Sequence, residues 1–220
     1  MEISLPPPTG IRPEIDSLEN DQTIRSFDWE GGRLESRFMS TNAAGPQPEK
    51  TDPGEEWVDL IDEENRVIGR KTRLEIRTQN LLHRGVGIIC FNPDGDVYVH
   101  RRTETKDVFP GMYDMFVGGV VASGEAYETA AAREILEELG IDGPSPEYLF
   151  SHLYEGPRNR SSIQVFRAVW DGPIVHQEEE IAWGTWLPGT ELESWAEAHS
   201  IVPDGLEVFE HYLEWLKNSS

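Results

Sequence analysis

Residues 119–141 read GVVASGEAYETAAAREILEELGI. The later part of this segment carries a strong helix signal, because residues 125–139 are mostly good helix formers and include three consecutive alanines. Gly140 follows directly and is typical of a residue that ends a helix. We therefore expect a helix over residues 125–139 that is entered from a glycine-containing loop.

Three glutamates of this helix, Glu134, Glu137 and Glu138, stand at spacings that place them side by side on one face. Apolar residues fall on the opposite side at about 100° per residue; they are Ala132, Ile135, Leu136 and Leu139. Adjacent like charges repel, and a divalent cation among them would remove the repulsion. Carboxylate oxygens suit Mg²⁺ or Mn²⁺. A solvent-exposed acidic helix face would give the same pattern, so the helix alone leaves both readings open.

The flanking residues complete a longer pattern. Gly119 is followed after five residues by Glu125, and after seven more by Arg133-Glu134-Ile135-Leu136-Glu137-Glu138-Leu139-Gly140-Ile141. This segment resembles the Nudix box without deviation, so the chain is identified as a member of the Nudix hydrolase superfamily. The resemblance implies hydrolysis of a small-molecule diphosphate linked to another moiety, X, by attack of water on phosphorus.

The resemblance also implies roles for the residues of the box. Glu134, Glu137 and Glu138 would hold Mg²⁺ or Mn²⁺, and one of their carboxylates would activate the water. Arg133 belongs with them in the catalytic set and would make a structural ion pair. Glu125 would be a further metal ligand or a support for the other ligands.

A second acidic cluster precedes the last strand that we expect. In many Nudix enzymes a glutamate at such a place binds metal or acts as the base, and Glu180 of the run 178–180 is our candidate. A solvated charge run explains the same residues equally well.

The segment before the box resembles the isopentenyl-diphosphate isomerase-like branch in residues 101–106 and 109–114. That resemblance implies that Arg102 and Lys106 bind the diphosphate, although surface ion pairs would also account for them. An isomerase needs a cysteine and a histidine where this chain has Val117 and Gly119. His83 resembles an isomerase histidine ligand in its place along the chain. We therefore favour hydrolysis and keep two alternatives, an isopentenyl-diphosphate isomerase and a non-catalytic Nudix ligand-binding module.

The order of elements predicts the fold class. We expect strands at 57–61, 66–69, 86–91, 97–100, 115–121, 148–154, 163–170 and 181–187, and helices at 74–82, 125–139, 191–199 and 206–217. The runs 86–91 and 97–100 flank a polar turn and predict a hairpin. This order is typical of an α+β fold, an α/β/α layered sandwich with a mixed β-sheet. Residues 1–54 are proline-rich and lack periodicity, which predicts a disordered or loosely attached arm ahead of a Nudix domain at 55–220.

The amino-acid composition limits the classes of partner that the protein is expected to bind. The 220 residues carry a formal net charge of −22, which disfavours nucleic-acid polymers and anionic membranes as partners. No apolar run approaches the roughly 20 residues of a membrane helix, and no secretory signal is evident at the start. The single cysteine, Cys90, excludes an internal disulfide framework. We expect a cytoplasmic protein that acts on a small molecule, with a homodimer left open.

The acidic excess also predicts a salt dependence. A folded domain with this charge repels itself at low ionic strength, so we interpret it as a protein of an acidic, halophile-type proteome. A merely acidic protein that is stable at any salt concentration would have the same composition. The melting temperature should rise between low salt and molar KCl, because salt screens the repulsion. Thermal unfolding followed at both salt concentrations tests this, and an unchanged melting temperature would contradict it.

Overall fold

The computed structural model describes residues 53–143 and 145–219. The strands are β1 (Trp57–Ile61), β2 (Val67–Thr72), β3 (His83–Phe91), β4 (Val97–Arg102), β5 (Tyr113–Asp114), β6 (Val117–Val120), β7 (Glu147–Glu155), β8 (Arg160–Val169) and β9 (Ile181–Leu187). The helices are α1 (Arg73–Thr78), α2 (Tyr127–Leu139), α3 (Leu192–Ala198) and α4 (Pro203–Ser219). Apart from residues 53 and 54, the arm expected at 1–54 lies outside the described residues and stays a prediction.

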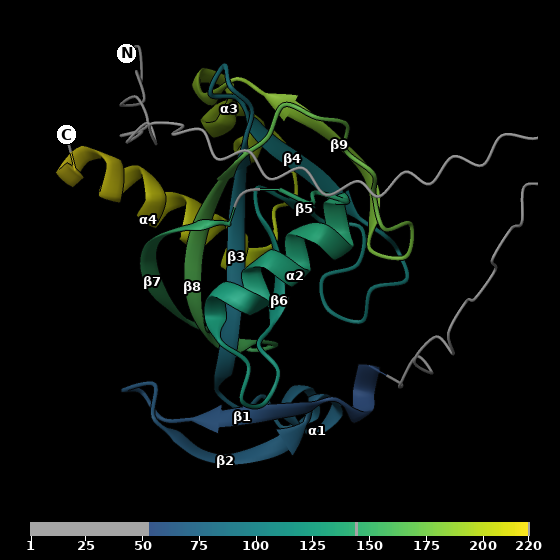
Figure 1. Cartoon of the computed structure of the whole chain (residues 1–220), viewed down its shortest axis with the longest axis vertical. Coiled ribbons are helices and arrows are strands. Elements are labelled where there is room, and N and C mark those ends of the chain that lie inside the picture. Colours follow the sequence, from purple (N-terminus) through teal and green to yellow (C-terminus); the bar gives the residue numbers. More distant parts are fainter. Residues whose placement is uncertain (1–52, 144, 220) are drawn as a thin grey trace, which may run out of the picture. The chain divides into compact units, whose positions relative to one another are not determined.

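Strand β3 is the centre of a mixed sheet (Figure 1). It runs parallel to β8 along its whole length and antiparallel to β6 over residues 85–88. Its residues alternate between two helical layers. Val86, Ile88 and Cys90 belong to the core cluster that α2 covers, whereas Ile89 and the helix α4 residue Val208 line a small void on the opposite side. These two buried faces explain the continuous apolar run, and they confirm the α+β layered fold with a mixed sheet.

The predicted hairpin is present but short, because β3 and β4 pair antiparallel beside the turn at residues 92–96 and then separate. Strands β3 and β4 meet only at Phe91 and Val97. The long edges of β3 are taken by β8 and β6, so β4 diverges and pairs along its length with β9. This divergence carries His100 and Arg102 away from β3 and leaves room for a cavity between them.

Helix α2 buries a different face from the one that we expected. Leu136 is 47% exposed, while Glu134 and Glu138 are only 8% and 6% exposed. The buried face combines these two carboxylates with small and apolar residues, namely Ala130, Ala131, Ile135 and Leu139. The simple division into an apolar side and a solvated acidic side is therefore wrong, because the helix packs two of its three glutamates against β6 and the cavity.

Helix α1 is shorter than the predicted segment 74–82 and begins with a capping box. The Thr72 hydroxyl accepts from the backbone N–H of Glu75, and the Glu75 carboxylate accepts from that of Thr72. Asn80 adopts a left-handed backbone with φ 50°, which prevents the helix from continuing. The fixed start of α1 orients Arg73 and Arg77 toward the cavity.

Helix α4 closes the other face of the sheet. Val208, Phe209 and Tyr212 are buried, and the Tyr212 ring lies 6.1 Å from that of Phe91 between centroids. This packing brings the first turn of the helix, with Asp204, to the cavity. Within the described residues, none of the helices has the length and apolar character needed to cross a bilayer.

Gly140 provides a direct test of how α2 ends. Its φ is 66°, and an added Cβ would lie 3.0 Å from Val175 Cβ. Gly140→Ala should lower the free energy of unfolding by about 1–2 kcal/mol, because L-residues are strained in this conformation. Urea unfolding measures the change. Gly189→Ala is the control, since nothing lies within 4 Å of its added Cβ. Equal stabilities of the two variants would contradict the assignment.

Candidate active site

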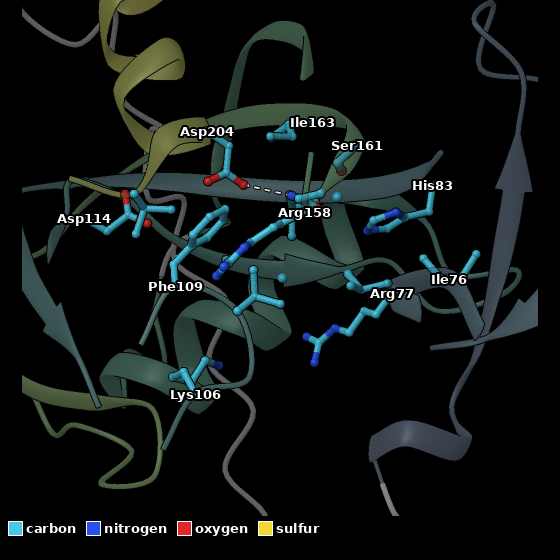
Figure 2. Close-up of a pocket in the computed structure, with 18 of the residues that line it drawn as sticks. Ile76, Arg77, His83, Lys106, Phe109, Asp114, Arg158, Ser161, Ile163 and Asp204 are labelled. Carbon is cyan, nitrogen blue, oxygen red and sulfur yellow. Dashed lines mark hydrogen bonds between the residues drawn. The ribbon is translucent and has the colours of Figure 1, made fainter. Parts of the chain in front are cut away.

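A cavity of about 120 Å³ lies between α1, the ends of β3 and β4, the glycines of strand β6 and the first turn of α4 (Figure 2). Helix α2 contributes Glu138 to its lining. Side chains from segments far apart in the sequence therefore meet at one place.

Five cationic side chains line this cavity. Four come from two segments, namely Arg73 and Arg77 of α1, Arg102 of β4 and Lys106 of the following loop, and the fifth is Arg158. Burial, followed by the charges of Arg73 and Arg102, lowers the pKa of Arg77 to about 10. Burial and the charge of Arg102 likewise lower the pKa of Lys106. Arg73, Arg77 and Lys106 also make ion pairs with Glu56, Asp107 and Glu180. The cavity nevertheless gathers enough positive charge to attract an anionic group.

The acidic face of α2 reaches this cluster. Burial, followed by repulsion from Glu134, raises the pKa of Glu138, while Lys106 and Arg102 act in the opposite direction. Burial also raises the pKa of Glu134. These carboxylates are held in a place where carrying their charge is costly, which is typical of functional sites.

Arg133 connects the loop to the helix. Its Nε and Nη2 donate to the two Glu125 carboxylate oxygens at 3.0 and 3.1 Å, and Nη2 also donates to the carbonyl of Val120 at 3.2 Å. Its Nη1 donates to Glu134 at 2.8 Å and to Glu137 at 3.2 Å. The ion pair between Arg133 and Glu125 is present, and both carboxylate oxygens of Glu125 accept from Arg133. The role of Glu125 as a metal ligand or as a support for the other ligands stays a prediction.

Gly119 leaves the space that Glu134 fills. A Cβ at this position would stand 2.4 Å from Glu134 Oε1. Any side chain at residue 119 would therefore displace the carboxylate. The glycine of the sequence pattern has a packing reason here, namely the close approach of the helix carboxylate to the loop.

The carboxylates fit a hard divalent cation in donor type and in the space that Gly119 leaves for Glu134. They do not yet form a closed ligand set, because Arg133 lies between Glu134 and Glu137. Across residues 53–143 and 145–219, no three His, Cys, Asp or Glu side chains are grouped closely enough to hold an ion. Joint metal binding by the three glutamates would require Glu137, with its side chain 52% exposed, to turn away from Arg133.

Glu180 reaches the site through a cation. Its carboxylate makes an ion pair with Lys106, whose charge in turn acts on Glu138. Glu180 thus lies beside the basic cluster. Its role as a metal ligand stays a prediction, as do the metal-binding and catalytic roles of Glu134, Glu137, Glu138 and Arg133.

Buried polar atoms without a hydrogen-bond partner mark the same cavity. The described part of the chain has five such side-chain atoms: Arg73 Nε, Asn80 Oδ1, His100 Nδ1, Arg102 Nε and Asp204 Oδ1. All five belong to residues that line the cavity. Because buried polar groups are nearly always paired in proteins, this concentration indicates a surface built for a polar ligand.

Sequence reasoning found Arg102, Lys106 and Glu138, which all line the cavity. It missed Arg73 and Arg77, although two like charges four apart on a short helix are a usable signal. It also missed cavity residues that carry no motif: His100, Asp114, Arg158, Asn159 and Asp204. Only the folded sheet brings these together.

The positions that distinguish an isomerase are packed differently here. Val117 is buried at 3% exposure, and Gly119 adjoins Glu134. His83 lines the cavity, but its Nδ1 lies 3.0 Å from the carbonyl oxygen of Leu81, and burial lowers its pKa. His83 Nδ1 is thereby engaged by the backbone immediately before β3.

Residues 81–211 match the family described as the NUDIX domain. The chain is 44% identical over 165 residues to "Uncharacterized Nudix hydrolase SCO1686" of Streptomyces coelicolor, covering 73% of this chain and 90% of that protein. It is 38% identical over 166 residues to "Uncharacterized Nudix hydrolase YfcD" of Escherichia coli K12, covering 75% and 89%.

Solved structures share the fold. The crystal structure of DR0079 from Deinococcus radiodurans superposes with a TM-score of 0.58 at 29% identity, covering 71% of this chain and 98% of that one. A MutT protein from Methanosarcina mazei gives a TM-score of 0.52 at 21% identity, covering 63% and 94%, which supports the fold alone.

The buried Glu138 predicts a pH dependence of stability in metal-free protein. Its pKa is raised from the ordinary 4.5, so above that pH the folded state binds more protons than the unfolded state, and stability falls as pH rises. Glu138→Gln should make this decline shallower. Urea unfolding with a chelator between pH 5 and about 9 measures it. Glu137→Gln, at a half-exposed site, is the control. Parallel curves for wild type and Glu138→Gln would contradict the prediction.

Proposed function

The chain belongs to the Nudix hydrolase family, and from this premise we propose that it is a metal-dependent pyrophosphohydrolase acting on a small-molecule diphosphate linked to a moiety X. The observation that carries the proposal is the meeting of partly buried cations with Glu138 of α2 around one cavity. A diphosphate is the anion that such a cluster suits, because bound phosphate oxygens would relieve the mutual repulsion of the cations.

In the proposed reaction, the oxygen of a water molecule forms a bond to one phosphorus and the bridging P–O bond breaks. A proton of the water passes to a carboxylate of the set Glu134, Glu137 and Glu138. Arg102 and Lys106 hold the phosphate oxygens and stabilise the charge that the leaving group gains. Arg133 keeps the glycine loop against the helix, so that the acceptor carboxylates stay in place.

Mg²⁺ or Mn²⁺ would be held by Glu134, Glu137 and Glu138, with Glu125 and Glu180 supporting or completing the set, and would neutralise the phosphate charge. Helix α2 contributes the carboxylates from one rigid element. Carboxylates on one rigid helix are positioned more accurately than carboxylates on separate loops would be.

The same assays also distinguish two alternative functions. An isopentenyl-diphosphate isomerase is disfavoured by Val117 and Gly119, which stand where that reaction needs acid–base groups. A non-catalytic Nudix module is disfavoured because three mutually repelling glutamates and an adjoining glycine have no evident use in a retired site.

The experiment is release of phosphate or pyrophosphate from a panel of diphosphates with Mg²⁺, in low salt and in molar KCl. The panel contains nucleotide sugars, dinucleotides, nucleoside triphosphates and isopentenyl diphosphate. We expect turnover of at least one member, lost on chelation and reduced about 100-fold or more by Glu138→Gln. Arg102→Ala should raise KM roughly tenfold or more, since it removes charge-assisted hydrogen bonds to the diphosphate.

Arg66→Ala is the matched control, because Arg66 is 71% exposed and pairs only with acidic neighbours of its own turn, Asp62 and Glu64. Its kinetics should equal those of wild type. Isomerisation of isopentenyl diphosphate without hydrolysis would support the first alternative. Tight binding of a panel member with no turnover in either salt would support the second, and each result would overturn the proposal.

A further inference from the structure

The cavity brings cations and carboxylates together. Figure 2 shows Lys106 and Arg77 on one side and Asp114 and Asp204 on another, with Arg158 between them. Asp114 is buried, and its pKa is raised well above its ordinary value by burial and by the charge of Asp204.

The cavity also holds two acceptor oxygens that no described residue satisfies. Asp204 Oδ2 accepts from the amide of Asn159 at 2.9 Å, but Asp204 Oδ1 is buried without a partner. Asn80 donates to the carbonyl of Gly156 at 3.0 Å, and its Oδ1 is likewise buried without a partner. Both residues are thus fixed by one contact and leave an acceptor oxygen for something else.

His100 adds a nearly inaccessible polar group to this surface. It is 2% exposed and lines the cavity, and its Nδ1 has no partner. Burial and the nearby Arg102 lower its pKa to about 3, so the ring is neutral at ordinary pH. Strand β5 places Asp114 directly opposite His100, which joins the two residues on adjacent strands.

Ion pairing inside the protein does not account for the two acids. Among the described residues, neither Asp114 nor Asp204 has a Lys, Arg or His nitrogen within ion-pair distance. Arg102 acts on both only as a nearby charge. Asp114 accepts from the backbone N–H of Met115, whereas Asp204 Oδ1 keeps unused accepting capacity, which is costly unless a ligand donor completes it.

We infer that Asn80, His100 and Asp204 form the subsite for moiety X, and that Asp204 selects diphosphates whose X group donates hydrogen bonds. An N–H or O–H group of X would meet Asp204 Oδ1 and Asn80 Oδ1 while the diphosphate lies among the basic residues. A hydrocarbon X would leave these buried acceptors unsatisfied and would be rejected. The inference rests on the proposed function only in assigning the diphosphate to the basic residues.

The test uses three diphosphates that differ in X. Cytidine diphosphate carries an amino group on a base, phosphoribosyl diphosphate carries hydroxyl groups and no base, and isopentenyl diphosphate carries no donor in its tail. Binding is measured on the whole protein, by calorimetry with and without Mg²⁺, so that the readout does not need turnover. We expect one or both donor-bearing ligands to bind more tightly than isopentenyl diphosphate.

Asp204→Asn keeps the size and shape of the side chain. It replaces one acceptor oxygen of the carboxylate by an amide N–H, which cannot accept a hydrogen bond from moiety X. It should weaken binding of the preferred donor-bearing diphosphate roughly tenfold to a hundredfold and leave isopentenyl diphosphate unchanged. Glu207→Gln, on the exposed side of the same helix, is the matched control and should change neither. Unchanged melting temperatures of both variants would show that the fold is retained.

The outcomes separate this inference from the proposed function. Selective weakening by Asp204→Asn without any hydrolysis in the panel would support the subsite and overturn the hydrolase. Hydrolysis accompanied by equal affinities for the three ligands, or by equal effects of Asp204→Asn on all of them, would overturn the subsite and leave the hydrolase standing. Failure of every donor-bearing ligand to bind would also overturn the subsite.

Discussion

The burial of two carboxylates on helix α2 is the constraint around which the rest of the site is arranged. Glu134 and Glu138 lie almost entirely out of solvent, where an unpaired charge would be severely destabilising. The protein offsets this cost in two directions. Arg133 donates a hydrogen bond to one oxygen of Glu134, and the positive charges of Lys106 and Arg102 favour the ionised form of Glu138.

Backbone geometry makes that burial possible. Gly119 brings the loop close enough for Glu134 to lie against its α-carbon, and Gly140 ends the helix in a left-handed conformation. Arg133 then connects the loop carbonyl of Val120 to the carboxylates of Glu125 and Glu134. The glycines, the arginine and the glutamates of the box are one packing unit, which explains why they stand together in a single segment of the chain.

The cavity adjoins this packing unit, and its lining carries both cations and carboxylates. Cations of α1 and of the loop after β4 line it, together with carboxylates of β5 and of the first turn of α4. A ligand with an anionic end and a hydrogen-bond-donating end would satisfy both. In the proposed function and subsite, the reacting phosphate and the moiety X would contact different elements of the fold, so one could vary without disturbing the other.

The sequence was sufficient for the family, the layered fold and the box, because these depend on contacts within 23 consecutive residues and on local periodicity. Arg102 and Lys106 could also be read from the segment before the box. The sequence could not reveal that Glu134 and Glu138 face inward or that β4 pairs along its length with β9. Nor could it reveal that His100 and Asp204 line the same cavity. These features follow from long-range strand pairing and helix packing, which no local pattern encodes.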